Sequence, residues 1–389
     1  MSYTNFPSCR IGSLRQFSTM KQSILKNVLS RTFVALTLSA CVLSCSDSDS
    51  ESPSNLFTVN GITYRVISTG EVAVTALPDI QSINIPSSVT DGKKNYVVTT
   101  IGEVETLLPI ANEVKSVTLP STARVIADQA FRDCGYLERV NLPTSLTSIG
   151  EYAFRNCVTL KNVTLPFSLT HMGTGAFSWT GIEKITLPLW LTRLPDEAFY
   201  NCELKEVNIP PFLVSIGRDA LNIPVTSVMD SQKTTIRCFS IFPALCPSGN
   251  PFGTYSYSAS LKVLFGGLYE IMPYWRDMTD IDTFTSNEYS IDTRKLVASW
   301  KTEESSDTWT FNADGTYAIS GQTSETGTWR VEDNVVLVMI DTYDRAKKGQ
   351  AYIDKDNRLL YRYEQLSSPH SSITGTDVQL STFSQIVTQ

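Results

Sequence analysis

Histidine is almost missing from this sequence of 389 residues, which contains only His171 and His370. Histidine is the side chain best suited to acid–base chemistry near neutral pH, and it is a common metal ligand. Both histidines are expected at the surface, the first on an outward-facing repeat position and the second in a polar tail. The sequence also lacks a glycine-rich phosphate loop, a serine elbow, a CxxC pair and a calcium-binding loop. It therefore predicts no catalytic residue, no metal and no cofactor.

Long hydrophobic runs are missing as well. The mean hydropathy is −0.06, and the one candidate run, residues 32–44, is too short to span a hydrocarbon core of roughly 30 Å. This run follows the basic stretch 21–31 and ends in small residues beside a cysteine, which is the order of a secretory signal. We predict that residues 1–45 are a signal region and that translation starts at Met20.

Two cysteines at the end of this run are candidates for lipidation. Residues 38–41 (L-S-A-C) resemble a bacterial lipobox, and residues 42–45 (V-L-S-C) form a looser one. The Ser, Asp and Glu run that follows resembles the export signal of surface lipoproteins from Gram-negative gut and oral anaerobes, which favours Cys45. The small residues before Cys41 favour that alternative. An acylated cysteine would anchor the protein to the outer membrane without a spanning helix, and we expect the anchored protein to be exposed at the cell surface. A cleaved signal without lipid is the other interpretation.

Positive charge is scarce beyond this segment. The sequence has 32 Lys and Arg against 39 Asp and Glu, a net charge of −7. Residues 1–45 hold five of the basic residues and none of the acidic ones, so the remainder has a net charge of −12. An acidic chain gives no electrostatic footprint for nucleic acid. The charge also argues against direct binding to an anionic membrane surface.

A repeated unit dominates the sequence from Val114 to about Asn222. It is written V-x-x-V-x-L-P-x-x-L-x-x-I-G-x-x-A-F-x-x-C, and its proline recurs at steps of 23, 23, 22 and 22 residues, at Pro120, Pro143, Pro166, Pro188 and Pro210. A fixed period in this range predicts a solenoid of short parallel strands, in which each turn buries its apolar side against its neighbours. The predicted fold class is therefore mainly β.

Each slot of the repeat has an expected direction. In the second turn the inward side chains are predicted to be Val140, Leu142, Leu146, Ile149, Ala153, Phe154, Cys157 and Leu160. The outward ones are predicted to be Glu138, Arg139, Asn141, Thr147, Glu151 and Arg155. Cys134, Cys157 and Cys202 share one inward slot, which predicts a structural ladder of buried, unreactive thiols and not a zinc site, because zinc needs convergent ligands. Cys238 and Cys246 are close enough in sequence to form a disulfide, which the sequence leaves open.

These repeats resemble the BspA-type leucine-rich repeat of bacterial surface proteins. Residues 142–157 carry the Leu-Pro, Ile-Gly, Ala-Phe and Cys elements in register, and residues 119–134 carry the same elements with Ile-Ala in place of Ile-Gly. The resemblance extends over about residues 56–285. It implies an N-terminal cap with a degenerate repeat at 56–113, after a polar tether at 46–55, and repeats with a C-terminal cap at 114–285. Two departures are Ala-Leu at 220–221 in place of Ala-Phe, and Leu-Phe at 264–265 where a proline is usual.

The pattern changes after a predicted linker at 286–295. Alternating segments around turns at 312–315, 332–334 and 355–357 predict a small antiparallel β-barrel or half-barrel at 296–367. This segment resembles the lipocalin-like modules found on the same class of lipoproteins, although Ala298 replaces the glycine of their G-x-W signature. The last residues, 368–389, are expected to be a frayed polar tail.

The informative departures lie just after the Leu-Pro pairs. Polar residues occupy these positions in the first two turns, but later turns carry apolar ones, namely Phe167, Leu189, Trp190 and Phe212. Trp179 stands where other turns have Asp133, Asn156 and Asn201. An exposed apolar stripe of this kind marks an interaction site, so these five residues are candidates for partner binding. The alternative is that the C-terminal cap or the barrel docks on the stripe.

The leading functional hypothesis is a non-catalytic cell-surface lipoprotein. The resemblance implies that its solenoid binds macromolecular partners, protein or glycan, in adhesion or host interaction. The alternative is a glycan- or small-ligand-binding accessory lipoprotein that uses the C-terminal β module.

Overall fold

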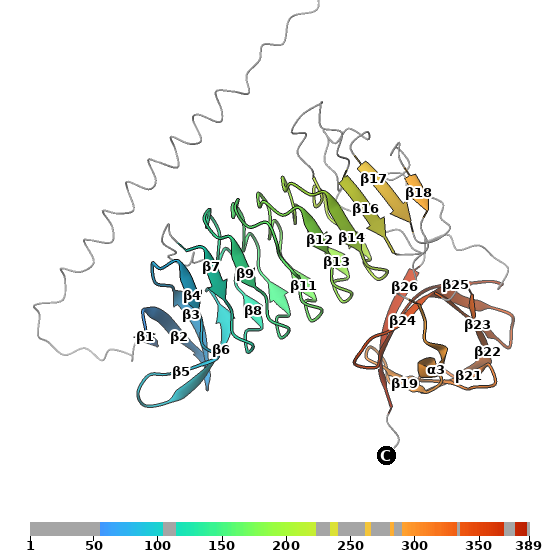
Figure 1. Ribbon diagram of the computed structural model, residues 1–389. Helices are drawn as coiled ribbons and strands as arrows, with labels where there is room; N and C mark the ends of the chain where they lie inside the picture. The colour runs from blue at the N-terminus through green and yellow to red at the C-terminus, as the bar shows by residue number, and fades with distance from the viewer. Residues whose placement is uncertain are drawn as a thin grey trace, which may run out of the picture. The chain divides into compact units, whose positions relative to one another are not determined.

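The computed structural model describes residues 55–103, 114–222, 234–239, 261–265, 281–283, 290–332, 335–368 and 378–386. These residues form a β-solenoid and a closed β-barrel (Figure 1). The predicted fold class, a mainly β solenoid of parallel strands followed by a small antiparallel barrel, is confirmed. In the described part of the chain, no helix is long and apolar enough to cross a membrane.

The solenoid begins with an antiparallel cap. Its strands are β1 (Leu56–Val59), β2 (Ile62–Ser68), β3 (Glu71–Ala76), β5 (Ser88–Thr90) and β6 (Asn95–Ile101). Asn60 and Gly61 have φ angles of 51° and 80°, so the Asn-Gly pair forms a tight hairpin between β1 and β2. The parallel pairing of β3 with β6 then starts the solenoid.

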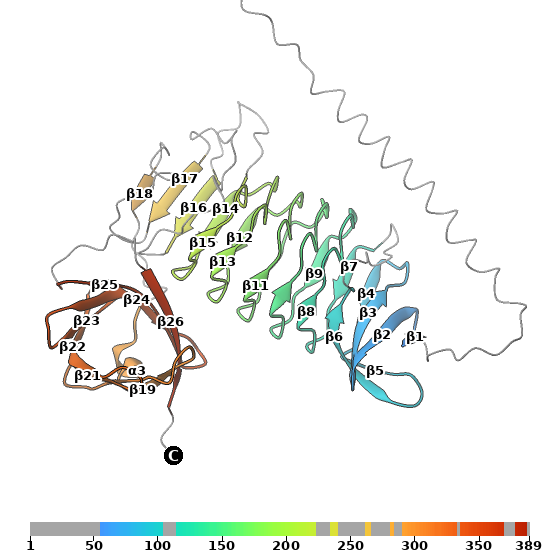
Figure 2. The same ribbon diagram turned by 180° about the vertical axis from the view of Figure 1, so that it is seen from behind.

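The repeats form two sets of parallel strands. One set contains β4 (Ser82–Asn84), β7 (Ser116–Thr118), β9 (Arg139–Asn141), β12 (Lys184–Thr186), β14 (Glu206–Ile209), β16 (Thr234–Cys238), β17 (Leu261–Phe265) and β18 (Ile281–Thr283). The other, which Figure 2 shows from behind, contains the two-residue strands β8 (Val125–Ile126), β10 (Ser148–Ile149), β11 (His171–Met172), β13 (Arg193–Leu194) and β15 (Ser215–Ile216). Equivalent residues of successive turns pair in register, as with Ser148 and His171.

The solenoid core is built from the slots that the repeat predicts. Phe131, Phe154, Phe177 and Phe199 are fully buried and stack from turn to turn. The inward residues predicted for the second turn are buried, with Leu142 partly so, and the outward ones are exposed except for half-buried Arg155. The stacked repeats therefore share one continuous apolar core, as a solenoid requires.

The barrel closes with eight strands, in the order β19 to β26. They are β19 (Ser299–Thr302), β20 (Thr308–Phe311), β21 (Thr316–Ser320), β22 (Glu325–Glu332), β23 (Val336–Asp341), β24 (Ala346–Ile353), β25 (Arg358–Leu366) and β26 (Val378–Gln385). A short helix, α3 (Thr293–Leu296), precedes them, and Asp292 caps it by accepting from the Arg294 backbone N–H. Trp300 lies in the barrel core and its indole Nε1 donates to the Leu296 carbonyl at 2.9 Å.

Two predicted boundaries need correction. The tail was expected to be frayed, but β26 lies within it and pairs with both β19 and β25 to close the barrel. Apolar and polar residues alternate only weakly along β26, because polar residues fill many of its positions. The strand is stabilised by backbone hydrogen bonds along both of its edges. The end of the predicted linker is also part of the barrel, because Ile291 packs into its core.

Candidate functional site

The outer side of the β4–β7–β9–β12–β14 strand set is a polar surface, called the strand face below. Its outward side chains form two rows, Ser82, Ser116, Arg139, Asn162, Lys184 and Glu206 in one, and Asn84, Thr118, Asn141, Thr164, Thr186 and Asn208 in the other. None of these twelve side chains is aromatic. In the second row, Asn141 Oδ1 accepts from the Leu119 backbone N–H at 2.7 Å, which ties one turn to the next.

Charge alternates along the edge of the strand face. Lys115, Glu138, Lys161, Glu183 and Lys205 occupy one slot in successive turns. Lys205 Nζ lies 2.8 Å from Glu183 Oε2, and this hydrogen bond lowers the pKa of the Glu183 carboxyl. Burial raises the pKa of Glu206, but its ion pairs with Arg237 and Lys184 dominate, so that the pKa falls. Glu183 and Glu206 are thus paired carboxylates.

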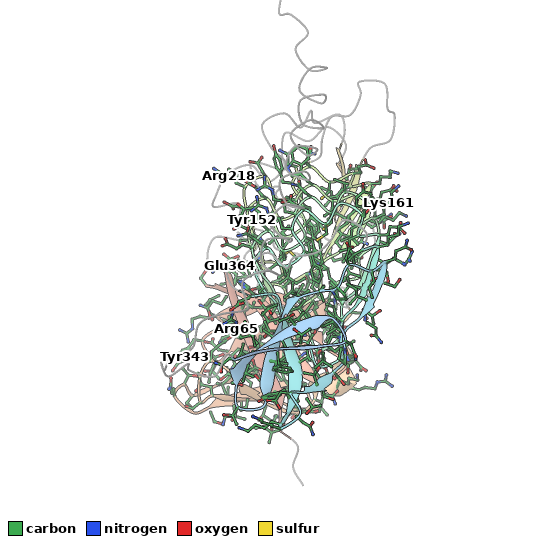
Figure 3. All side chains as sticks on the ribbon, turned by 90° about the vertical axis from the view of Figure 1, so that its left-hand side faces the viewer. Arg65, Tyr152, Lys161, Arg218, Tyr343 and Glu364 are labelled. Carbon is green, nitrogen blue, oxygen red and sulfur yellow. The ribbon has the colours of Figure 1, made fainter. Side chains whose placement is uncertain are left out.

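The strand face has an excess of basic groups. Together with the edge it carries five basic residues, Lys115, Arg139, Lys161, Lys184 and Lys205, against Glu138, Glu183 and Glu206. The Arg139 and Lys184 side chains are 71% and 72% exposed. Lys161 lies on the opposite side of the solenoid from Tyr152 and Arg218 (Figure 3). A locally basic surface on an acidic chain favours an acidic partner.

The positions after each Leu-Pro pair have a structural function in the early turns. The hydroxyl groups of Ser145 and Ser168 donate to the carbonyls of Ala123 and Leu146 in the preceding turn, both at 2.6 Å. Trp190 and Phe212 take this slot in the next two turns. These rings cannot make the same hydrogen bond, so the aromatic stripe replaces polar links between turns by apolar surface.

The barrel contacts much of this predicted stripe. Phe212 is fully buried, and half-buried Trp190 has the Arg358 guanidinium carbon 4.0 Å from its ring centroid. The Lys355 ammonium lies 3.6 Å from the centroid of Phe167, which is 37% exposed. Leu189 is half-buried. Of the two interpretations of the stripe, these contacts support docking of the barrel.

Trp179 lies apart from these contacts. Its φ is 60°, and Asp133, Asn156 and Asn201 in the same slot have φ values of 63°, 62° and 56°. Asn and Asp tolerate this left-handed conformation better than other residues with side chains, and a bulky ring there is an outlier. The half-buried Trp179 ring packs 6.2 Å from Tyr200 of the next turn. It stays a candidate for partner binding.

The cysteine ladder consists of thiols turned toward carbonyls. Cys157 Sγ and Cys202 Sγ are fully buried and donate to the carbonyls of Phe131 and Phe177, each at 3.1 Å. Burial raises the pKa of Cys157, and it raises that of Cys202 to about 11. Cys134 is half-buried. Cys41, Cys45 and Cys246 lie outside the described residues, so lipidation stays a prediction, and the sequence leaves open a disulfide between Cys238 and Cys246.

The comparison with known families matches this repeat. Residues 111–223 match the model of the BspA type leucine rich repeat region in six copies. The chain belongs to the BspA-type leucine-rich repeat family. Proteins of this kind generally act at surfaces or in protein binding, and the match indicates no enzymatic family. A comparison with curated proteins finds no significant match.

Several solved structures are similar to the BspA-type chain. A leucine-rich repeat protein from Bacteroides capillosus is 33% identical over 32% of this chain and 92% of its own, with a TM-score of 0.29. One from Bacteroides ovatus is 22% identical over 60% of this chain and 79% of its own, with a TM-score of 0.37. A leucine rich cell surface protein from Faecalibacterium prausnitzii is 20% identical over 71% of this chain and 62% of its own, with a TM-score of 0.40.

An ion pair between Lys347 and Glu325 lies among the described residues of the barrel interior. Lys347 Nζ lies 2.6 and 2.7 Å from the Glu325 oxygens, and the Tyr317 hydroxyl donates to Glu325 Oε1 at 2.5 Å. Burial, and then the bond to Glu325, raise the pKa of Tyr317. The Glu325 carboxylate thus accepts three hydrogen bonds from within the barrel. Aromatic and aliphatic side chains form the buried core of the barrel, including Trp300, Phe311, Leu337 and Tyr361.

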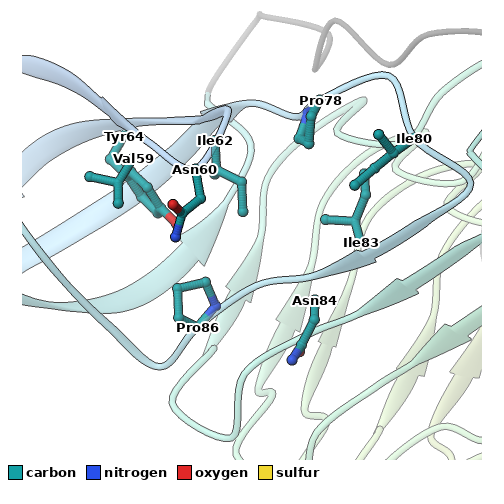
Figure 4. A pocket seen from close by; sticks show the side chains of 9 residues that line it. All are labelled: Val59, Asn60, Ile62, Tyr64, Pro78, Ile80, Ile83, Asn84 and Pro86. Atoms are coloured by element: carbon teal, nitrogen blue, oxygen red, sulfur yellow. The ribbon is translucent and has the colours of Figure 1, made fainter.

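The described residues offer few other candidates for a catalytic, metal-binding or ligand-binding site. His171 is exposed on β11, in the predicted outward slot, and His370 lies outside the described residues. Within those residues, no group of three or more His, Cys, Asp or Glu side chains is placed to hold a metal ion. A pocket of about 180 Å³ in the N-terminal cap is lined by Val59, Asn60, Ile62, Tyr64, Pro78, Ile80, Ile83, Asn84 and Pro86 (Figure 4). Its volume is below that of ordinary ligand sites.

Proposed function

We propose that this BspA-type protein is a non-catalytic binding protein whose strand face holds an acidic region of a protein partner. The observation that carries this proposal is the group of exposed basic side chains on the strand face and its edge, Arg139, Lys161 and Lys184, in three successive turns of a chain of net charge −7. Complementary charge steers association and fixes orientation. A surface that repeats at the strand spacing of about 4.8 Å suits an extended partner.

The lack of aromatic side chains in the two rows of the strand face weighs against a neutral glycan as its ligand, because sugar rings stack on aromatic rings. The filled interior of the barrel weighs against the alternative function, small-ligand binding within the barrel. Adhesion to a host or neighbouring-cell protein is therefore the function that we favour.

The protein is further proposed to be an outer-membrane lipoprotein exposed at the cell surface. The support is sequence alone: the hydrophobic run 32–44, the cysteines at its end, and the acidic Ser-rich stretch after them. Cys45 is the preferred site and Cys41 the alternative. The intact mass of the N-terminal peptide of membrane-extracted protein distinguishes diacylated Cys45, diacylated Cys41 and an unmodified cleaved end.

The binding proposal is tested with the chain from residue 46 onward on an array of purified extracellular-matrix proteins and glycans. We expect capture of acidic proteins that weakens as salt rises. Lys161→Glu together with Lys184→Glu should reduce this capture at least about tenfold, which corresponds to about 1.4 kcal/mol. Arg218→Glu, on the opposite side of the solenoid, is the matched control and should leave capture unchanged. Capture of glycans alone, or equal capture by all variants, contradicts the proposal.

A further inference from the structure

The outer face of barrel strands β24 and β25 is buried, although the outer face of a barrel strand is normally exposed to water. Inward residues of a barrel strand alternate with outward ones, and Tyr361 and Ala351 belong to the barrel core. Their neighbours Gln350, Leu360 and Arg362 therefore point outward, yet they are 2%, 0% and 2% exposed. On β22, by contrast, the outward residues Thr326, Thr328 and Arg330 are exposed. One side of the barrel is thus covered.

The solenoid supplies hydrogen-bond acceptors to this covered side. Arg362 Nη1 donates to the Leu213 carbonyl at 2.9 Å, and Gln350 Nε2 donates to the Phe239 carbonyl at 3.1 Å. Gln350 and Arg362 are direct cross-strand partners. Burial lowers the pKa of Arg362 to about 10, so the guanidinium stays charged at neutral pH. A buried charge of this kind is retained only where acceptors meet it.

The acceptor on the solenoid has a specific place in the repeat. Leu213 occupies the slot of Ala123 and Leu146, whose carbonyls accept from the hydroxyls of Ser145 and Ser168 in the following turn. The Leu213 carbonyl accepts from the barrel side chain Arg362. The barrel therefore contacts a repeat slot whose carbonyls link neighbouring turns earlier in the array.

The hairpin between β24 and β25 extends this contact along the aromatic stripe. Asp354 accepts from the Asp356 and Arg358 backbone N–H groups at 2.9 and 2.8 Å, and from Arg358 Nε at 2.9 Å. These bonds fix the planar guanidinium of Arg358, which covers the ring of Trp190. A guanidinium stacked on an indole is the favourable cation–π pair.

We propose that the outer face of β24–β25 and its hairpin form a cap for the loop edge of the solenoid, and that Phe167, Trp190 and Phe212 are the docking surface for this cap. The partner of the stripe is then the chain's own barrel. The stripe changes from hydroxyl-bearing to aromatic residues in the turns that meet the barrel, where apolar and aromatic side chains can be covered by a second element. The proposal stands independently of the ligand of the strand face.

Hydrogen exchange on the full chain tests this proposal. Trp190→Ala should speed exchange at the backbone amides of Asp356 and Arg358 about tenfold, and Arg358→Ala should speed exchange at the amides of Leu191 and Leu213 comparably. Exchange in the double variant should be little faster than in either single variant, because both substitutions remove the same contact between Trp190 and Arg358. Arg330→Ala, on the exposed outer face of β22, is the matched control and should change neither region.

A variant at an exposed position tests the same contact if the Trp190 and Arg358 substitutions disturb folding. Lys355 is 62% exposed, so Lys355→Ala retains the barrel and should still raise exchange near Phe167. Unchanged exchange in every variant overturns the cap. The cap is also overturned if Trp190→Ala leaves exchange and the unfolding midpoint unchanged but removes capture on the array, because the stripe then binds an external ligand.

Discussion

The rings of Phe154 and Phe177 stack with centroids 5.0 Å apart and planes inclined by 4°. Phe131 and Phe199 continue the stack on either side, at 5.1 and 5.5 Å. Each ring fills the same slot of its turn and contacts its copies above and below. The stack therefore couples the stability of each turn to that of its neighbours, as expected of an array in which no turn has a core of its own.

Removing one ring from the middle of this stack should be costly. Phe154→Ala deletes a fully buried ring with a stacked partner on each side, so we expect the free energy of unfolding to fall by about 3–5 kcal/mol. Urea denaturation followed by circular dichroism measures it. Thr164→Ala, on the exposed strand face, serves as the control and should change stability by less than about 0.5 kcal/mol. Equal effects of the two variants would refute the stacked core.

Gly173, which occupies the slot of Gly150 in the next turn, should not accept a side chain. A Cβ on Gly173 would lie 2.4 Å from the Glu151 backbone nitrogen and 2.6 Å from the Gly150 carbonyl carbon. Gly173→Ala should therefore destabilise the solenoid by about 1–3 kcal/mol. Gly135→Ala is the matched comparison, since its nearest neighbour, Val158 Cγ2, would lie 4.0 Å away. Thermal melting of both variants checks the difference, and a stable Gly173→Ala protein would count against the close approach of the turns.

The buried thiol of Cys202 predicts a loss of stability at high pH. Its pKa is about 11 in the folded protein, against 9.0 ordinarily. The folded state thus holds the thiol proton more tightly than the unfolded state does. The contribution of this thiol to the free energy of unfolding is complete below pH 9 and disappears as the pH rises from about 9 to about 11. We expect the stability advantage of the native protein over Cys202→Ala to shrink between pH 8 and pH 10.5, measured by urea denaturation. A stability difference between the native protein and Cys202→Ala that stays constant or grows over this pH range would contradict the raised pKa of the buried thiol.

Closure of the barrel should depend on β26. A chain that ends at residue 368 lacks β26 and leaves β19 and β25 as open edges, which readily pair with other chains. We expect this chain to aggregate or form oligomers in size-exclusion chromatography. A chain that ends at residue 386 retains β26 and is the control. Monomeric behaviour of the shorter chain would show that β26 is dispensable for closure.

The periodic features of the solenoid could be predicted from the sequence, because each position of the repeat has the same neighbours in every turn. The inward positions of the second turn, the Asn60-Gly61 hairpin and the outward place of His171 follow from local patterns. By the same logic Trp179 could be recognised as a departure. The left-handed conformation shared by its slot explains why Asp or Asn occupies that slot elsewhere.

The sequence left docking of the barrel on the stripe as one of two interpretations, but it did not reveal the individual contacts between these distant segments. Arg362 donates to the Leu213 carbonyl 149 positions away, and it does so from an outward barrel position that carries no periodic signal. A hint existed in Leu360 and Arg362, since an apolar residue on the outward side of a predicted barrel strand suggests a covered face. β26 was missed because its inward and outward residues differ little in polarity, although pairing on both edges stabilises it.

The sequence by itself determined the period, the direction of each repeat slot, the stacked phenylalanines and the buried thiols, because a repeated local pattern gives each turn the same neighbours. Only the tertiary structure decided which outward surfaces are available. It places Arg358 on Trp190 and Arg362 on the Leu213 carbonyl, while Arg139 and Lys184 on the strand face stay exposed. The exposure of an outward side chain depends on what packs against it, and the packing element here is a barrel more than a hundred residues away in the chain.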